Sequence, residues 1–311
     1  MNICIIGAGA MGTLFAGLLA KGENNVSLLV KNKNTETVIK TTGIHISGIS
    51  NCYIQPSKIK VSTIPLKTNL NIHRLVIVLV KSYDTISVLP ILKQIVGKDT
   101  FVLTLQNGLG NYEIINRVIP KTRIVRGVTS EASILKTTGF AIHTGKGETI
   151  IEGCGGVECG DTKIAKEIAN IFNHCGLKTK ITNSIESAIW SKLVLNCAIN
   201  PVTAISGVKN GDILKYRNLY EVAIESGKEV MQVAKAVDIP ILFSDCCEKI
   251  EQVCKATSKN MNSMLADVRA NKKTEIEFIN GAVIKIAEKL KIPVPVNKSL
   301  YSLVKKLEKT N

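Results

Sequence analysis

The chain has 311 residues, of which 45% are hydrophobic and 21% charged, and it carries a formal net charge of +15. This length can bury one large core or two smaller ones, and we expect two domains. No apolar run looks long enough to cross a bilayer and no charged leader precedes the first strand-like run, so we expect a cytoplasmic protein without membrane span or signal peptide.

A glycine-rich turn opens the chain. Residues 2–6 are a short apolar run typical of a buried strand, and GAGAMG follows before an apolar helix-like stretch. In this context the first glycine permits a tight turn, the second lets the backbone approach a pyrophosphate, and the third allows close helix–strand packing. The alternative is a chance glycine turn. We predict a dinucleotide site formed by Gly7, Ala8, Gly9, Ala10, Met11 and Gly12.

Two lysines follow strands of the same predicted sheet. The strand at 26–30 ends in Lys31, where an NAD-selective site usually has an acid that binds the ribose 2′-hydroxyl. The strand at 75–80 ends in Lys81. Cations there suit a 2′-phosphate, so we predict NADP(H) as the cofactor. Ordinary strand-end charges are the alternative in a lysine-rich chain.

The first part of the chain alternates between strand-like and helix-like segments, which predicts a doubly wound, Rossmann-like sheet. The further strands are expected at 100–105, 123–128 and 177–182, and the helices at 11–22, 84–96, 111–118 and 161–175. Residues 43–62 suggest an inserted hairpin and 131–151 a strand pair. QNGLG at 106–110 directly follows a strand, at the edge of the sheet where ligands bind in such folds.

From Ser184 onward the apolar period is helical. Helices are expected at 185–199, 216–237, 246–268, 273–290 and 297–308, with breaks at Pro201, Pro240, Pro293 and Pro295. We therefore expect an α/β protein with a dinucleotide-binding Rossmann-like domain at 1–182 and an all-helical substrate and catalytic domain at 183–311.

A polar row interrupts the first of these helices. WSKLVLNCAINP at 190–201 sets Lys192, Asn196 and Asn200 at four-residue steps among apolar residues. On a helix these side chains drift by only about 80° in total and share one side. Burying such groups without partners costs roughly 1–3 kcal/mol each, so the row is expected to face a ligand across the domain boundary or a tight network. A solvated face is the alternative.

Nine cysteines, an odd number without CxxC spacing, indicate reduced thiols. Cys154 and Cys159 flank GGVE, Cys246 and Cys247 are vicinal, and the four histidines are dispersed, so we expect no metal. The lysines are spread along the chain and aromatic residues make up only 4%, which argues against nucleic acid. A basic field equally attracts an anionic dinucleotide and a carboxylate substrate.

Together these motifs resemble the ketopantoate reductase, or 2-dehydropantoate 2-reductase, family over essentially the whole chain. The matching segments, in the family's order, are GAGAMG, VLVKS at 78–82, LQNGLG at 105–110, WSKLVLNCAINP at 190–201, NMNSMLADV at 260–268 and TEIEFINGAV at 274–283. The resemblance implies reduction of 2-dehydropantoate to (R)-pantoate with NADPH, on the route to pantothenate and coenzyme A. Members that use NADPH commonly have arginine at the position of Lys31, so here the chain departs from the pattern.

The resemblance also implies roles for individual residues. Lys192 matches the general acid, and Glu275 matches the glutamate near that lysine and the substrate hydroxyl. Asn107 matches an asparagine beside nicotinamide and substrate. Both Asn107 and Glu275 are therefore expected to contact the cofactor as well as the substrate. Substrate-binding roles fall to the amides and hydroxyl of Asn107, Asn196, Asn200, Asn260 and Ser263.

The chemistry fits this assignment. Hydride transfer to a ketone builds negative charge on its oxygen, and Lys192 is the available proton donor. A carboxylate nearby favours the charged amine, and the apolar spacing after Glu275 puts that acid near the buried stripe of a helix. The alternative is a surface acid that follows Lys272 and Lys273.

Two other functions remain open. A related enzyme acting on another 2-oxo or 2-hydroxy acid would keep Lys192 but bind its substrate through other side chains. A non-enzymatic NADP(H)-binding regulator would keep Gly7–Gly12 without needing an amine opposite two amides. The partner we expect is a small 2-oxo acid, with neither nucleic acid nor membrane, and association of two copies in a homodimer stays open.

Overall fold

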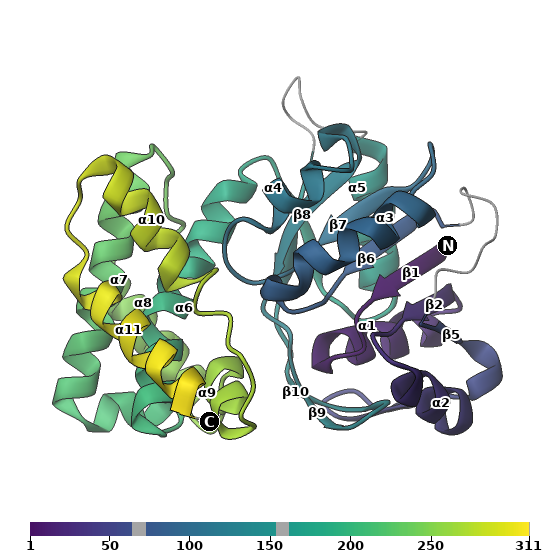
Figure 1. The fold of residues 1–311 in the computed structure, drawn as a ribbon, viewed down its shortest axis with the longest axis horizontal. Helices are drawn as coiled ribbons and strands as arrows, with labels where there is room; N and C mark the ends of the chain where they lie inside the picture. The colour runs from purple at the N-terminus through teal and green to yellow at the C-terminus, as the bar shows by residue number, and fades with distance from the viewer. Residues whose placement is uncertain (64–72, 154–161, 311) are drawn as a thin grey trace. The chain divides into compact units, whose positions relative to one another are not determined.

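The computed structural model describes residues 1–63, 73–153 and 162–310 (Figure 1). The chain divides into two compact units. Unit 1 comprises Met1–Gln106 and Asn111–Ile185, and unit 2 comprises Asn107–Gly110 and Glu186–Asn311. The boundary expected after residue 182 thus moves to Ile185, and a short segment from the middle of the first half groups with the helical unit.

Unit 1 is built on an eight-stranded sheet. Its strands are β1 (Asn2–Ile6), β2 (Asn25–Leu29), β5 (Lys60–Ser62), β6 (Leu75–Val78), β7 (Phe101–Thr104), β8 (Ile124–Thr129), β11 (Thr149–Glu152) and β12 (Thr179–Thr182). They lie in the order β12-β11-β8-β7-β6-β1-β2-β5. All neighbours are parallel except β8 and β11, which are antiparallel. The predicted Rossmann-like sheet is confirmed.

Helices cover both faces of this sheet (Figure 1). They are α1 (Ala10–Lys21), α2 (Lys33–Thr42), α3 (Leu89–Ile95), α4 (Asn111–Asn116) and α5 (Thr162–His174), with 3₁₀ turns η1 (Pro56–Lys58), η2 (Ser82–Val88) and η3 (Lys121–Arg123). Successive residues of a strand point to opposite faces. Ile3 and Ile5 of β1 accordingly join the cluster that contains α1 and α5, whereas Cys4 and Ile6 join the one that contains α3.

A second, four-stranded sheet packs on α1. Its strands are β3 (Ile44–Gly48), β4 (Cys52–Ile54), β9 (Ala132–Thr137) and β10 (Phe140–Gly145), in the order β4-β3-β10-β9. The hairpin expected within 43–62 is β3 and β4, while residues 60–62 of that segment belong to the main sheet as β5. The pair expected within 131–151 is β9 and β10, and β11 is a third strand there.

Unit 2 is helical, as predicted. It contains α6 (Ile185–Ser206), η4 (Asn210–Lys215), α7 (Arg217–Ala236), α8 (Cys246–Ala256), α9 (Ser263–Arg269), α10 (Asn280–Leu290) and α11 (Pro295–Thr310). Its core forms around α6, whose Val194, Cys197 and Ala198 are completely buried. The arrangement of α6 among the later helices can be followed in Figure 1.

Three expectations about these helices are wrong. Pro201 does not end the first one, because α6 continues through it to Ser206. The helix expected at 246–268 is two helices, since Asn262 caps a new one by accepting the backbone N–H of Leu265 at 3.1 Å. The helix expected from residue 273 begins at Asn280, so Glu275 lies in the turn before it.

Among the described residues, α6 is also the one helix long and apolar enough to cross a membrane, contrary to the expectation that every apolar run is too short. About 72% of its most apolar window is buried inside the protein. A core helix of a globular protein passes the same length and hydropathy test.

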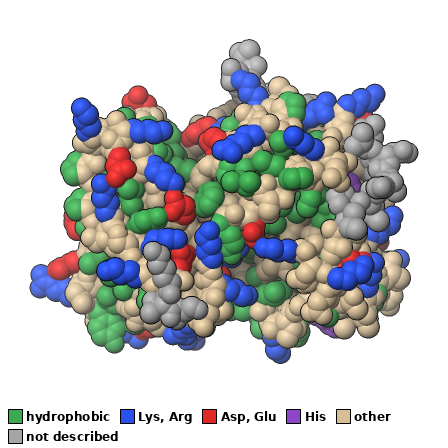
Figure 2. Space-filling model, viewed as in Figure 1, with side chains coloured by type: hydrophobic (Ala, Val, Ile, Leu, Met, Phe, Trp, Pro, Cys, Tyr) green, Lys and Arg blue, Asp and Glu red, His purple; other side chains and the backbone are tan. Residues whose placement is uncertain are grey.

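On the face drawn in Figure 2, Lys and Arg side chains are interspersed with acidic and hydrophobic ones in each unit.

The cysteines that the structure describes are all free thiols. Cys154 and Cys159 lie outside the described residues. Burial raises the pKa of the Cys4 thiol in β1 to about 12 and that of Cys254 in α8 to about 11. Such thiols are poor nucleophiles, so they act as small hydrophobic residues of the two cores.

Candidate active site

The glycine turn in unit 1 has the geometry that a dinucleotide requires. Gly7 has φ +107°, a conformation that residues with a Cβ rarely adopt, and a Cβ on Gly12 would lie 1.8 Å from the carbonyl oxygen of Gly7. Gly9 caps α1, and a Cβ built there meets nothing within 4 Å. The first turn of α1 thus begins at an open backbone position, where N–H groups can receive a pyrophosphate.

The other residues of the motif hold this turn in place. Ala10 is the first residue of α1, and Ala8 accepts a 3.3 Å hydrogen bond from the Thr13 hydroxyl through its carbonyl. The side chains of Ala8 and Met11 pack against the hydrophobic core of unit 1. Their contribution is to the packing of the turn, so contacts with an anion would come from the backbone.

Lys31 and Lys81 flank the glycine turn. The strand order β6-β1-β2 puts the ends of these three parallel strands side by side, and Lys81, Gly7 and Lys31 follow them in turn. Lys31 is exposed, with its Nζ 3.4 Å from Asp84 Oδ1 in η2. A surface ion pair of this kind contributes about 0–1 kcal/mol, so a phosphate can compete for the amine. No local pattern points to Asp84, because the pair joins the end of β2 to η2, which are distant in the chain.

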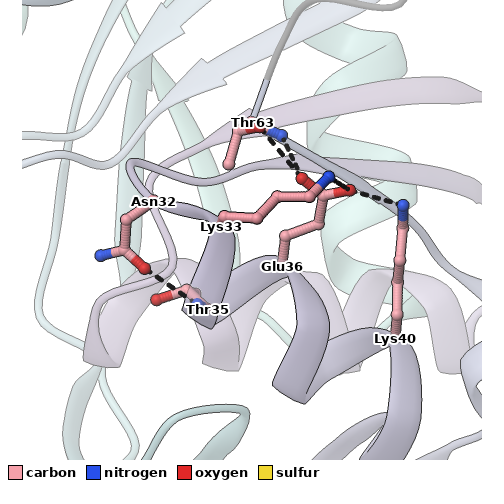
Figure 3. A network of polar contacts seen from close by, with 6 residues as sticks. All are labelled: Asn32, Lys33, Thr35, Glu36, Lys40 and Thr63. Carbon is pink, nitrogen blue, oxygen red and sulfur yellow. Dashed lines mark hydrogen bonds and ion pairs between the residues drawn. The ribbon is translucent and has the colours of Figure 1, made fainter.

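A buried carboxylate fixes the segment after Lys31 (Figure 3). Glu36 of α2 accepts hydrogen bonds from Lys40 at 2.6 Å and Lys33 at 3.0 Å, and from the backbone and hydroxyl of Thr63, both at 3.0 Å. The Lys40 and Lys33 amines are the main causes that lower the pKa of Glu36 to about 2. Asn32 caps the same helix by accepting the Thr35 N–H.

The segment after Lys81 is fixed by the side-chain amides of Gln106, which follows β7, and Asn111, which begins α4. Gln106 donates to the Val80 carbonyl at 3.0 Å and to the Thr85 hydroxyl at 2.8 Å. Asn111 accepts from Thr85 at 2.8 Å and donates to the Ser82 hydroxyl at 3.2 Å. These contacts hold η2, which carries Asp84, against β7 and α4.

In unit 2, Lys192, Asn107 and Glu275 form a chain of polar contacts. Lys192 Nζ donates to Asn107 Oδ1 at 2.8 Å, and Asn107 Nδ2 donates to Glu275 Oε2 at 3.2 Å. Burial lowers the pKa of the Lys192 amine to about 8, against the opposing field of Glu275, which raises it. Around neutral pH the amine is therefore largely protonated yet able to release its proton.

Asn107 reaches this cluster through a docked loop. Gly108 has φ +78°, and a Cβ there would lie 2.1 Å from the carbonyl oxygen of Phe278, so glycine is required for conformation and for space. Leu109 N–H donates to that same carbonyl at 2.8 Å. This explains why the segment 107–110 groups with the helical unit.

Glu275 is buried, although it is not on a helix. Only 5% of the residue is exposed, and its carbonyl accepts the N–H groups of Phe278 and Ile279 at 3.0 and 3.1 Å. The preceding Thr274 donates through its backbone N–H and its hydroxyl to Glu308 of α11, at 2.8 and 2.7 Å. The turn that presents the carboxylate is thus anchored on both sides, and the interpretation of Glu275 as a surface acid is wrong.

Asn196 and Asn200 follow Lys192 on α6. Asn196 is half-buried and Asn200 is buried. In the part of the chain that the structure describes, neither side-chain amide is hydrogen-bonded to another residue. Both therefore keep their donors and acceptors for a ligand or water.

Asn260 and Ser263 lie around the start of α9. Ser263 is its exposed first residue, and the carbonyl of Asn260 accepts the backbone N–H of Asn210 at 3.2 Å. No sequence pattern singles out Asn262, which connects this segment to α6, or its partner Asn210 in η4. Asn262 donates to Asn210 Oδ1 at 2.9 Å and to the hydroxyl of Thr203 at 2.5 Å. Within the described residues, neither the Asn260 nor the Ser263 side chain is hydrogen-bonded to Lys192.

Two family models and a curated relative match this chain, and all three carry the name of the same family. The family model "Ketopantoate reductase PanE/ApbA" matches residues 3–155, and "Ketopantoate reductase PanE/ApbA C terminal" matches residues 184–308. A 2-dehydropantoate 2-reductase of Pyrococcus horikoshii is 37% identical, with 99% of this chain and 98% of that protein covered.

Solved structures resemble the chain over its full length. A PanE/ApbA family ketopantoate reductase from Ralstonia eutropha has a TM-score of 0.88 at 27% identity, covering 100% of this chain and 99% of that one. D-mandelate dehydrogenase in complex with NADH has a TM-score of 0.86 at 25% identity, with the same coverage.

Proposed function

Because the chain belongs to the ketopantoate reductase family, we propose that it is an oxidoreductase that reduces 2-dehydropantoate to (R)-pantoate with NADPH. The observation that carries this proposal is the contact chain from Lys192 through Asn107 to Glu275. It provides an amine whose pKa is near 8, held in a defined direction by a neutral amide. A proton donor of this kind is what reduction of a ketone requires.

Lys192 supplies the proton in this reaction. Reduced nicotinamide, when bound, supplies a hydride to the ketone carbon. As the carbon–oxygen double bond opens, the ketone oxygen takes a proton from Lys192 Nζ, which yields the 2-hydroxy acid and a neutral amine. Water then returns a proton to the amine. Glu275 favours the charged amine before transfer, and Asn107 keeps the amine directed while contacting the carboxylate.

The remaining polar residues of unit 2 bind the substrate. Asn196 and Asn200 have unused amide groups on the helix that bears Lys192, and the Asn260 amide and Ser263 hydroxyl lie near the start of α9. Amides and hydroxyls both donate and accept, so they suit a molecule with a carboxylate, a ketone and a hydroxyl. None of them adds a charge that would perturb Lys192.

NADPH is the proposed cofactor because cations follow both strands beside the glycine turn. Gly7–Gly12 bind the pyrophosphate, and Lys31, assisted by Lys81, binds the 2′-phosphate. The similar D-mandelate dehydrogenase was solved with NADH, so the fold alone does not select between the two cofactors. Selectivity must come from side chains such as Lys31.

The proposal extends to the setting of the reaction. We place the enzyme in the cytoplasm, in the synthesis of pantothenate and hence of coenzyme A, and a homodimer is compatible with this proposal. A reductase for another 2-oxo acid is the second candidate, favoured by the similarity to D-mandelate dehydrogenase. A regulator without catalysis gives no reason for the pKa of Lys192 or its contact with Asn107.

The decisive experiment is an NADPH oxidation assay with purified protein against 2-dehydropantoate and a panel of other 2-oxo acids, including phenylglyoxylate. We expect the largest kcat/KM with 2-dehydropantoate. A larger value with another 2-oxo acid would support the second candidate. If no 2-oxo acid were reduced while dinucleotide binding was retained, the enzymatic proposal would fail.

A further inference from the structure

Pro201 leaves a backbone carbonyl of α6 without its helical partner. In an α-helix the N–H of residue 201 would donate to the carbonyl of residue 197, but proline has no N–H. Pro201 and Cys197 are both buried. A carbonyl left unsatisfied in a buried position is costly, so another donor is needed.

Two side chains from other helices supply donors. Ser226 Oγ of α7 donates to the Cys197 carbonyl at 3.0 Å, and Asn280 Nδ2, at the start of α10, donates to it at 3.3 Å. Both residues are completely buried. Helices α6, α7 and α10 therefore meet at the buried carbonyl that Pro201 leaves without a helical donor.

Asn280 is the better matched of the two donors. Its Nδ2 carries two hydrogens and has two acceptors, the Cys197 carbonyl and Asn297 Oδ1, the latter at 2.8 Å. Ser226 has one hydroxyl hydrogen for the same two acceptors, with Asn297 Oδ1 at 3.2 Å. Asn297 is held in turn by Glu229, which accepts its Nδ2 at 2.8 Å and its N–H at 2.9 Å.

Asn280 also terminates the turn that carries Glu275. The Glu275 carbonyl accepts the N–H of Ile279 at 3.1 Å, and the Ile276 carbonyl accepts the N–H of Gly281 at 2.9 Å. The Asn280 side chain thus connects this turn to the α6 backbone, between Asn196 and Asn200 on the helix that bears Lys192.

We propose that Asn280 is a positioning residue, which fixes the distance between the Lys192 amine and the Glu275 carboxylate by attaching the Glu275 turn to the carbonyl that Pro201 leaves open. It acts through these residues and touches neither substrate nor cofactor. This inference rests on the proposed function of Lys192 as proton donor. Without the Asn280 contact, the turn and α6 separate, and the field of Glu275 on Lys192 weakens.

The first test compares Asn280→Ala with Ser226→Ala. Each substitution removes one donor to the Cys197 carbonyl, but only the first releases the Glu275 turn. Titration of Lys192 is followed by its rate of reaction with trinitrobenzenesulfonate across pH, read by peptide mass spectrometry. We expect a lower Lys192 pKa in Asn280→Ala and the wild-type value in Ser226→Ala. Equal titration of Lys192 in the two variants and the wild-type protein would overturn the proposal.

Steady-state kinetics provide the second readout. Asn280→Ala should lower kcat with 2-dehydropantoate by roughly 10- to 100-fold, the scale for a displaced catalytic group, while KM for NADPH changes little. Ser226→Ala should keep kcat close to wild type even if its Tm falls. Equal kcat losses in the two variants would indicate a purely structural role for Asn280.

A double variant separates positioning from stability if Asn280→Ala folds poorly. Pro201→Ala restores an N–H that can donate to the Cys197 carbonyl. The double variant Pro201→Ala/Asn280→Ala should therefore have a higher Tm than Asn280→Ala, close to that of Pro201→Ala alone. Its kcat and its Lys192 titration should stay different from those of Pro201→Ala. Recovery of all three would refute the positioning role. Because the titration needs no turnover, a shifted Lys192 in a protein that does not reduce 2-dehydropantoate would refute only the proposed function.

Discussion

Lys192 donates a 2.8 Å hydrogen bond to Asn107, an amide that comes from a part of the chain 85 residues earlier. Asn107 uses its oxygen for the amine and its nitrogen for Glu275, so the orientation of the amide is determined by both partners. The neutral amide of Asn107 thus links the Lys192 amine to the Glu275 carboxylate, so Glu275 can favour the charged form of Lys192 without taking its proton.

Replacement of the proton donor is the most direct test of the mechanism. Lys192→Ala should lower kcat with 2-dehydropantoate by roughly 10²–10⁴, the usual effect of losing a general acid. NADPH affinity, measured by fluorescence titration, should remain within a few-fold of wild type. Lys228→Ala, which removes an exposed lysine of α7 paired with Glu225, is the matched control and should be active. Near-wild-type turnover of Lys192→Ala would exclude this lysine from the mechanism.

The pH dependence of kcat tests the role of Glu275. Lys192 must be protonated to act, so activity should fall as pH rises through about 8. Glu275 raises the pKa of this amine, and Glu275→Gln should therefore shift the basic limb of the profile to lower pH and decrease kcat. Glu277→Gln, whose carboxylate contacts Lys285 and Tyr301 instead, should leave the basic limb in place. Identical profiles for the two variants would mean that we have assigned the wrong acid.

Cofactor selectivity should depend on Lys31. A 2′-phosphate gains a charge-assisted hydrogen bond there, worth roughly 1.5–3 kcal/mol, so kcat/KM should favour NADPH over NADH. Lys31→Asp should abolish or reverse this preference, and added salt should reduce it in the wild-type enzyme. Asp84→Asn is the informative control, because it removes the anion that competes for Lys31 and should maintain or increase the preference. Equal use of both cofactors by the wild-type enzyme at low salt would contradict this role of Lys31.

Two glycine variants separate binding from folding in the dinucleotide turn. Gly9→Ala has space for its new methyl group and should keep the wild-type Tm but bind NADPH more weakly, because a methyl obstructs approach of the pyrophosphate. Gly12→Ala should lower Tm, since its Cβ would collide with the Gly7 carbonyl. Calorimetry provides both measurements. Unchanged NADPH affinity in Gly9→Ala would show that the ligand does not approach this position.

Glu36 should make stability pH-dependent on the acid side. Its pKa in the folded protein is about 2, below the value of about 4.3 expected in the unfolded chain. Its contribution is therefore fully present above about pH 5 and is lost as pH falls toward the folded-state value. The Tm difference between wild type and Glu36→Gln should be constant from pH 7 to 5 and shrink below that range. A difference that did not change down to about pH 2.5 would contradict the lowered pKa.

The features that the sequence predicts best are those that depend on residues adjacent in the chain. The turn at Gly7–Gly12 was recognisable because strand, glycines and helix are contiguous. The expectation that Pro201 ends its helix is wrong, because the local rule ignores Ser226 and Asn280, which satisfy the freed carbonyl from other helices. Tertiary contacts of this kind leave no periodic pattern in the sequence.

The candidate site was predictable as a set of residues but only partly as an arrangement. The spacing of Lys192 with two amides marks it as a candidate, whereas the pattern around Glu275 predicts a helix that in fact begins five residues later, at Asn280. The apolar spacing after Glu275 belongs to that helix and says nothing of where its first turn starts. Likewise, the Lys31–Asp84 pair joins the end of β2 to η2, two segments that no local pattern relates.

The short segment Asn107–Gly110 makes unit 2 discontinuous in the sequence. It belongs to unit 2, although residues of unit 1 precede and follow it. A helical fragment that begins at Glu186 would therefore lack the amide that contacts Lys192, however well it folded. Chimeras that exchange helical units between relatives should accordingly transplant this tetrapeptide with its Phe278 contact, so the functional module is discontinuous in the gene.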